Sequence, residues 1–341
     1  MVDFRDLEDL NKEKQRQKAP KVSFQRLDSD PDEGPSDQEQ ADENRKNLYQ
    51  KISDYVSQAF DAVKSQKGFD LEPGYRLLRK MVAVQSVRDP MFIMALHLDD
   101  PQKFILRHSV NVAIFAIKIA ARLGFSKNRQ LQIAMTALLH DIGTVLISDK
   151  IVYKKDRLTP QELQVIRERP THSYNILRSF DDDDHVYLAE CAFQVYERID
   201  GSGYPRGLKE DEIHQYAQII GLVDMYEALI HSRPQRERLT HFSAVKEIIQ
   251  SNKNSFQRIY LKCFLDAFSI FPIYSYVRLN SAAIGKVIET FPDHPLRPKL
   301  QIVCDSQKRR VLTERIVNLP DNPLLYVVDS ISEEEVKALS S

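Results

Sequence analysis

Three things are scarce in this chain of 341 residues: cysteine, net charge and long apolar runs. Its three cysteines, Cys191, Cys263 and Cys304, lie far apart and form no Cys-x-x-Cys pair. This usage is typical of a reducing compartment and argues against a metal site built from thiolates. The 48 basic and 49 acidic side chains leave a net charge of -1, so no overall field attracts nucleic acid or an anionic membrane.

Apolar runs in the sequence are too short for a membrane span. None reaches the roughly 18 consecutive residues that cross a bilayer, and the N-terminal MVDFRDLEDL is charged where a secretory signal would be apolar. We therefore expect a soluble cytoplasmic protein that binds neither nucleic acid nor membranes. At about 150 residues per domain, the length predicts one substantial domain with smaller pieces attached. Binding must then come from a local site.

Composition and periodicity divide the chain into five regions. Residues 1–45 carry few large apolar groups, and Asp28 to Glu43 holds eight acidic residues and no basic one. Such a region cannot bury enough surface to offset its ordering entropy, so we interpret it as a disordered acidic tail, with a partner-binding arm as the alternative. Residues 46–100 show two helical patterns, Leu48 to Val63 and Leu77 to Val87. These could form a small domain, a dimerising hairpin or a cap on the main core.

Residues 101–270 are predicted to form the main helical domain. Apolar stripes indicate one helix from Phe104 to Leu123 and a second from Lys127 to about Ile142. A third helix is strongly marked at its start, because Thr159 can cap it, proline follows, and a glutamate completes a capping box. We expect this helix to run to position 180, and we expect further helices over 186–196, 218–229, 242–251 and 256–268.

The character of the chain changes after position 270. Short runs of β-formers at 276–279, 285–288, 300–303 and 325–328 predict a small antiparallel sheet or barrel within residues 271–330. Residues 331–341 form a C-terminal tail, in which Ser332 and Glu335 could cap a last helical turn. The predicted fold class is mainly α: a helical bundle core with two preceding helices and a small C-terminal antiparallel β subdomain.

Polar side chains within apolar helices are the candidate metal ligands. His140 and Asp141 end an apolar helix, and because adjacent helical side chains diverge by about 100°, they could grip one ion from two sides. His108 lies on an apolar stripe, where a packed core histidine is the alternative. Asp224 lies in an almost wholly apolar helix, where an unpaired carboxylate would be costly to bury.

A glycine-rich segment, ERIDGSGYPRG at 197–207, cannot be the interior of a helix or strand. A surface turn is the simple interpretation. The alternative is a rigid platform for a phosphate-bearing ligand, because Tyr204 lies between Gly203 and Pro205 with Arg198 and Arg206 nearby.

Together these motifs resemble the HD-GYP family, a branch of the HD phosphohydrolase superfamily known for metal-dependent hydrolysis of the bacterial second messenger cyclic di-GMP. The resemblance covers roughly residues 102–252 and rests on His108, LLHDIG at 138–143, ERIDGSGYPRGL at 197–208, and VDMYEAL at 223–229 followed by Arg-Pro. It implies an HD-type helical bundle and four metal ligands: His108, His140, Asp141 and Asp224. Two imidazoles and two carboxylates suit one divalent ion such as Mn²⁺ or Fe²⁺.

The sequence departs from the family pattern at several further ligand positions. Arg169 stands before a proline where the family has histidine, and Val195 and Tyr196 replace paired histidines. Thr144 replaces a lysine, and Phe104 replaces a glutamate found in members with three metals. Valine and phenylalanine cannot ligate a metal, and arginine offers no lone pair. The resemblance therefore implies that the second and third metal sites are lost.

We expect a degenerate HD-GYP signalling protein that binds cyclic di-GMP or a related nucleotide, or docks a partner such as a diguanylate cyclase domain, with little or no hydrolysis. In this hypothesis, the permanently charged guanidinium of Arg169 binds a phosphate of the ligand. The alternative is that Arg169 is an exposed surface residue with no such role. The alternative function is an active metal-dependent phosphodiesterase or other phosphohydrolase with a reduced metal site, in which Asp141 is catalytic. A homodimer fits either function. The predicted ligand-binding residues are Arg169, Arg198, Asp200, Gly201, Gly203, Tyr204 and Pro205.

Overall fold

The computed structural model describes residues 37–83, 89–99, 104–180, 185–291, 294–311 and 313–339. The chain divides into two units, Met1–Asn44 and Arg45–Ser341. In the first unit, the described residues belong to the start of helix α2 (Asp37–Lys64), so the predicted disorder is wrong for positions 37–45. Glutamate, glutamine and alanine there are good helix formers, and acidic groups are favourable at a helix N-terminus. The rest of the predicted acidic tail, 1–36, lies outside the described residues.

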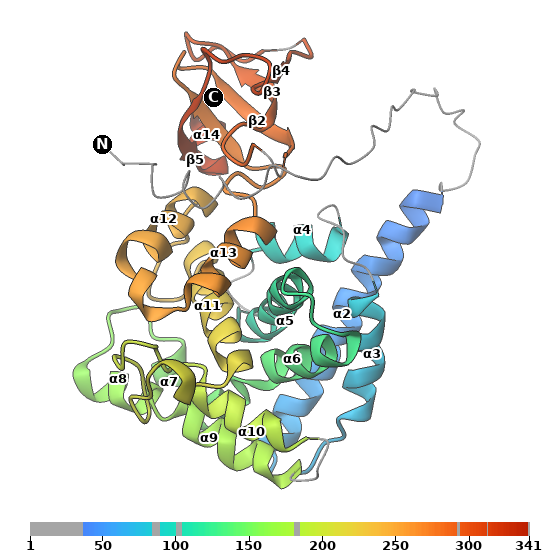
Figure 1. Ribbon diagram of the computed structural model, residues 1–341, viewed down its shortest axis with the longest axis vertical. Helices are drawn as coiled ribbons and strands as arrows, with labels where there is room; N and C mark the ends of the chain where they lie inside the picture. The colour runs from blue at the N-terminus through green and yellow to red at the C-terminus, as the bar shows by residue number, and fades with distance from the viewer. Residues whose placement is uncertain are drawn as a thin grey trace. The chain divides into compact units, whose positions relative to one another are not determined.

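Among the described residues before the main domain there are three helices, not two (Figure 1). They are α2, α3 (Glu72–Val82) and α4 (Pro90–His97). Asp89 opens α4, because its carboxylate accepts a hydrogen bond from the Met91 backbone amide at 3.1 Å and proline suits the first turn. Positions 84–88, which include the end of the second predicted helix, lie outside the described residues.

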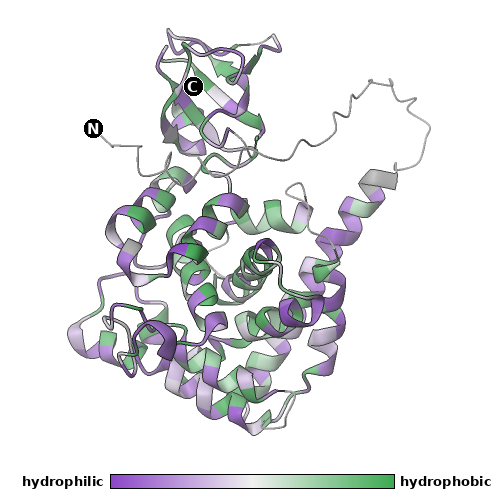
Figure 2. Ribbon diagram, in the orientation of Figure 1, coloured by the Kyte–Doolittle hydropathy of each residue, from purple (hydrophilic) through white to green (hydrophobic). Residues whose placement is uncertain are grey.

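Helices α5 (Phe104–Arg122), α6 (Lys127–Leu139) and α11 (Gln215–Ile230) pack together at the centre of the helical domain (Figure 1). Every residue of α5 from Arg107 to Ala120 is buried. Figure 2 shows hydrophobic residues along most of this helix. The three helices therefore form the interior in which the predicted site lies.

Helix α5 holds polar residues such as Arg107 and Lys118, so its apolar residues form no unbroken run. It is long and apolar enough to cross a membrane by length and composition, with a mean hydropathy of 1.5 over its best window. However, 78% of that window is buried inside the protein, as expected for the core helix of a bundle.

The segment after α6 is more irregular than predicted. The helix expected from position 160 to 180 is divided into α8 (Pro160–Ile166), α9 (Arg169–Leu177) and the short 3₁₀ helix η3 (Arg178–Phe180). The predicted capping box at Thr159 is present. The other elements of the domain are η2 (Ile142–Leu146), α7 (Asp149–Val152), α10 (Val186–Gln194), η4 (Glu210–Glu212), α12 (His241–Ser251), η5 (Lys253–Ser255) and α13 (Arg258–Ala267).

The C-terminal subdomain is a five-stranded antiparallel sheet in the order β4-β3-β2-β1-β5. Strand β4 lies outside the predicted runs, since its three residues are too few to show an alternating pattern. The predicted cap of the last helix is present: Ser332 and Glu335 exchange hydrogen bonds at the start of α14 (Glu333–Leu339). The strands are β1 (Tyr276–Leu279), β2 (Ile284–Glu289), β3 (Lys299–Cys304), β4 (Ile316–Asn318) and β5 (Val327–Ile331).

Candidate metal and ligand site

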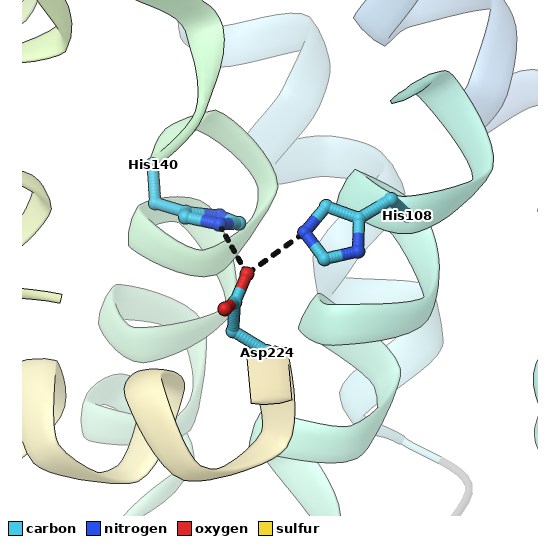
Figure 3. A group of neighbouring side chains, drawn as sticks. All are labelled: His108, His140 and Asp224. Carbon is cyan, nitrogen blue, oxygen red and sulfur yellow. Dashed lines mark hydrogen bonds and ion pairs between the residues drawn. The ribbon is translucent and has the colours of Figure 1, made fainter. Parts of the chain in front are cut away.

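Three of the four predicted metal ligands gather at one point in the core. His108 comes from α5, His140 caps the C-terminus of α6, and Asp224 comes from the middle of α11 (Figure 3). Their donor atoms lie within 4.8 Å of one another. Asp224 Oδ1 is 2.9 Å from His108 Nε2 and 3.3 Å from His140 Nε2. All three residues are buried, so the group forms one possible metal-binding triad.

The outer nitrogens of the two imidazoles fix which nitrogen faces the centre. His140 Nδ1 donates to the Ala137 carbonyl at 2.7 Å, and His108 Nδ1 donates to a buried carboxylate, Glu227. Each Nε2 can therefore present a lone pair toward the Asp224 carboxylate. A lone pair facing a carboxylate oxygen is repulsive unless a cation or a proton lies between them. The donor set thus fits a divalent ion.

The electrostatics of the triad agree with this need for positive charge. Burial opposes charging of His108, but Glu227 and Asp224 outweigh it and raise the pKa of the imidazole to about 9. Burial likewise opposes ionisation of Asp224, yet the two imidazoles hold the pKa of the carboxyl well below its usual range. The carboxylates around His108 therefore attract a cation to this point.

Asp141, the fourth predicted ligand, is engaged by other groups. Its Oδ2 accepts from Arg169 Nη1 at 2.9 Å, and its Oδ1 accepts from the Tyr196 hydroxyl at 3.2 Å. The Arg169 and Asp141 side chains are only 14% and 6% exposed, so the alternative of an exposed surface arginine is wrong. Burial opposes ionisation of Asp141, but Arg169 and the nearby imidazoles together lower its pKa. That a metal binds all four residues stays a prediction.

The other residues at expected family ligand positions form no second group of metal-binding side chains in the described part of the chain. The Tyr196 ring lies under the Arg169 guanidinium, 4.9 Å from its central carbon. Phe104 packs edge-on against Tyr153 with ring centroids 5.5 Å apart. Thr144 is buried, and its hydroxyl has no hydrogen-bond partner among the residues that the structure describes. The predicted loss of the second and third metal positions stays a prediction.

The glycine-rich segment is a tightly fixed loop. Glu197 is buried, and its carboxylate accepts the backbone amides of Arg206 at 2.7 Å and Leu208 at 2.9 Å. A Cβ on Gly203 would lie 2.4 Å from the Glu197 Cα, so no larger residue fits there without displacing the backbone. The Tyr204–Pro205 peptide bond is cis. The bonds to Glu197 and the close approach of its backbone to Gly203 hold the loop, and Tyr204 with it, in a defined place.

Tyr204 is the predicted loop residue that reaches the centre of the site. Its ring stacks on Tyr196, with centroids 5.2 Å apart and an interplanar angle of 4°. Arg167 approaches the Tyr204 ring, with its guanidinium carbon 5.4 Å from the centroid. The loop is thereby connected to Asp141 through Tyr196.

The remaining predicted loop residues serve the loop itself. Arg198 Nη1 donates to the carbonyl of Val195 at 3.0 Å and to that of Glu197 at 2.7 Å. Asp200 accepts from the Ser202 amide at 2.9 Å, and Gly201 has a positive φ of 79°. These contacts place Arg198, Asp200 and Gly201 in the structural support of the turn. Their predicted role in ligand binding stays a prediction.

Sequence reasoning missed Glu227, which is 2% exposed. Its Oε2 accepts from His108 Nδ1, and its Oε1 accepts from Asn111 Nδ2 at 3.1 Å. A signal was available, because Glu227 follows Asp224 by three positions on α11 and so lies on the same helix face.

Two family models match this chain. Residues 91–258 match the HD domain, and residues 276–339 match the KOW domain associated with HD domain. Together they span the helical domain and the β subdomain described above.

Several curated relatives of the chain are named cyclic di-GMP phosphodiesterases. Cyclic di-GMP phosphodiesterase PdeB of Borreliella burgdorferi is 29% identical over 201 residues, which cover 59% of this chain and 52% of that protein. Cyclic di-GMP phosphodiesterase PA4108 of Pseudomonas aeruginosa is 26% identical over 239 residues, which cover 70% of this chain and 57% of that protein. The chain thus spans about half the length of these curated relatives.

A solved structure shows the same fold. It is Bd1817, an HDG"Y"P protein from Bdellovibrio bacteriovorus, with a TM-score of 0.55 and 17% identity, covering 68% of this chain and 74% of that one. The helical HD domain, the ordered motifs of the site and these relatives agree: the chain belongs to the HD-GYP family of HD-domain proteins.

Proposed function

We propose that this protein is a degenerate HD-GYP signalling protein that binds cyclic di-GMP or a related cyclic dinucleotide, with one divalent ion and little or no hydrolysis. The observation that carries the proposal is the engagement of Asp141 by Arg169 at 2.9 Å and by Tyr196 at 3.2 Å. Both of its carboxylate oxygens accept hydrogen bonds from side chains that cannot ligate a metal in these protonation states.

The metal part of the proposal rests on the triad. His108, His140 and Asp224 would hold one Mn²⁺ or Fe²⁺, which would supply positive charge for a phosphate oxygen. The imidazoles are held by their outer nitrogens, so they keep their orientation whether or not the ion is bound. Efficient cleavage of a phosphodiester is favoured by a pair of ions, and here Arg169 supplies a fixed charge beside the triad instead.

The ligand part of the proposal rests on Arg169, Arg167 and the Tyr196–Tyr204 stack. A guanidinium recognises phosphate through charge and paired N–H donors. The half-buried Tyr204 ring, which stacks on the buried Tyr196, offers aromatic surface to a nucleobase, as aromatic side chains do in nucleotide-binding sites generally. Arg167 and Arg169 approach the Tyr204 and Tyr196 rings at 5.4 and 4.9 Å, so positive charge and aromatic surface occur together.

The test is to purify the whole chain anaerobically, count bound metal by mass spectrometry, and measure cyclic di-GMP binding and turnover on the same sample. We expect about one ion per chain, nucleotide binding by calorimetry, and no significant turnover. Arg169→Ala should weaken binding, whereas Lys150→Ala, which removes an exposed charge from α7, should not. Robust hydrolysis that is abolished by Asp141→Ala would overturn the proposal, and unchanged affinity of Arg169→Ala would remove Arg169 from the site.

The intact triad favours a second candidate function, a metal-dependent phosphodiesterase or other phosphohydrolase with a reduced metal site. The measurement of cyclic di-GMP turnover distinguishes this phosphohydrolase function from the proposed nucleotide-binding function. Docking to a diguanylate cyclase domain, homodimer formation and a cytoplasmic location stay predictions from the sequence.

A further inference from the structure

A buried hydrogen-bond network leads from helix α2 to the imidazole of His108. The Tyr49 hydroxyl donates to Asn111 Oδ1 at 2.9 Å, and Asn111 Nδ2 donates to Glu227 Oε1 at 3.1 Å. The other Glu227 oxygen accepts from His108 Nδ1. The exposed fractions of Tyr49, Asn111 and Glu227 are 3%, 0% and 2%, so water does not compete for these bonds. The network joins α2, α5 and α11.

The direction of each bond in this network is determined by its neighbours. Burial raises the pKa of the Tyr49 hydroxyl, so it stays protonated and donates. Asn111 must then turn its carbonyl oxygen to Tyr49 and its amide nitrogen to Glu227. Each Glu227 oxygen has a second cationic or N–H neighbour, since His231 Nδ1 lies 3.0 Å from Oε1 and Arg233 Nη2 lies 3.6 Å from Oε2.

We infer that Tyr49 and Asn111 are positioning residues for the metal centre, which act through Glu227 to fix the tautomer and ring orientation of His108. The inference rests on the proposed function, because it takes the His108 cluster to hold a divalent ion. Without the Tyr49 hydroxyl, the Asn111 side chain keeps only its bond to Glu227 and is held less firmly. Glu227 then shifts toward its remaining partners, and His108 loses its fixed orientation.

Helix α2 offers a matched control for Tyr49. Tyr55 lies on the same helix, is 8% exposed, and donates its hydroxyl to the Asp70 carbonyl at 3.0 Å. Tyr49→Phe and Tyr55→Phe therefore remove the same atom and the same kind of bond, but the Tyr55 bond is outside the network. A general loss of stability would affect both variants alike.

The first measurement is Mn²⁺ titration of the metal-free full-length chain. Loss of a partner in the outer shell of a metal site typically weakens metal binding about 10–100-fold. We expect Asn111→Leu to weaken binding about 10-fold, Tyr49→Phe to weaken it less, and Tyr55→Phe to match the unmodified protein. The double variant of Tyr49 and Asn111 should bind no more weakly than Asn111→Leu alone, since both changes break one pathway.

The second measurement needs no metal. The ¹⁵N NMR signals of the neutral His108 imidazole report which nitrogen carries the hydrogen, so they are recorded in the metal-free chain above the raised pKa of about 9. We expect Tyr49→Phe to lower the Nδ1–H population relative to Tyr55→Phe. Equal tautomer populations and equal Mn²⁺ affinities in these two variants overturn the inference while leaving the proposed metal centre intact. If the unmodified chain binds no Mn²⁺, the proposed metal centre fails, and the tautomer comparison alone then decides the role of Tyr49.

Discussion

Replacing Arg169 by alanine tests whether its guanidinium stands in for a second cation. Nη1 of Arg169 lies 2.9 Å from Oδ2 of Asp141, and the two side chains are 14% and 6% exposed, so the pair is largely withdrawn from water. The variant leaves a buried carboxylate without its ion-pair partner. We expect a lower free energy of unfolding, and a carboxylate that is newly available to a divalent ion.

The expected loss in the free energy of unfolding follows from the burial of the Arg169–Asp141 pair. Breaking a buried ion pair by removing one partner costs about 3–5 kcal/mol. The lower end applies here, about 3 kcal/mol, because Tyr196 still donates to Asp141 at 3.2 Å and the shortened side chain admits water. A divalent ion present at one hundred times its Kd stabilises the folded state by about 2.7 kcal/mol. Added Mn²⁺ should therefore restore more stability to Arg169→Ala than it adds to the unmodified chain.

The assay is urea unfolding of the full chain at neutral pH, with and without Mn²⁺, and Arg167→Ala is the control. Arg167 is exposed, lies two positions away, and makes no ion pair in the described residues. Arg169→His adds an imidazole at the same position and should raise the bound Mn²⁺ above one per chain. The reasoning is refuted if Arg169→Ala unfolds with the same free energy as Arg167→Ala at every Mn²⁺ concentration.

Three further predictions concern other parts of the molecule. Glu227→Gln should weaken Mn²⁺ binding about 10–100-fold by calorimetry, because an amide is a poorer acceptor for His108 Nδ1; unchanged affinity contradicts this. Burial, with neighbouring positive charge, holds the pKa of His241 well below 6.5, so its unfolded form takes up a proton first as the pH falls. Above pH 6.5 this group should not change the free energy of unfolding, and at pH 5.5 it should lower that free energy by about 1.4 kcal/mol. In urea unfolding, His241→Gln should lose less stability than the unmodified chain between these two pH values. An equal loss in both proteins contradicts the prediction. Gly203→Ala should lower the free energy of unfolding by about 1–3 kcal/mol and weaken cyclic di-GMP binding, because its Cβ would meet the Glu197 backbone at 2.4 Å; tolerance of the methyl group contradicts the tight loop.

Elements with a strong local signal were predictable from the sequence. The helix α5 and the capping box at Thr159 agree with their patterns, since an apolar stripe and a cap are set by neighbouring residues. The break between α8 and α9 was missed although Pro170 gives a signal for it, because a proline disfavours helical geometry in the residue before it. Strand β4 was missed because a three-residue edge strand depends on pairing with β3 more than on its own sequence.

The site shows where reasoning from sequence stops. Motifs predicted that His108, His140 and Asp224 would meet, and they do. They could not show that Asp141 turns to Arg169, because that contact joins residues 28 positions apart, one in the turn after α6 and the other at the start of α9. Glu227 was missed although its place three residues after Asp224 gives a signal, because its partner His108 lies 119 positions away on α5.

Arg169 and Tyr196 act together on the Asp141 carboxylate. Arg169 and Tyr196 come from different elements, yet each replaces a family histidine and each donates to one oxygen of the same carboxylate. The guanidinium also lies over the Tyr196 ring at 4.9 Å, and that ring stacks on Tyr204. A carboxylate satisfied on both oxygens is stable without a second ion, so the retention of Asp141 does not require a retained metal cluster. Under the proposed function, these contacts would place a permanent charge beside aromatic surface, where a phosphate and a base would be recognised.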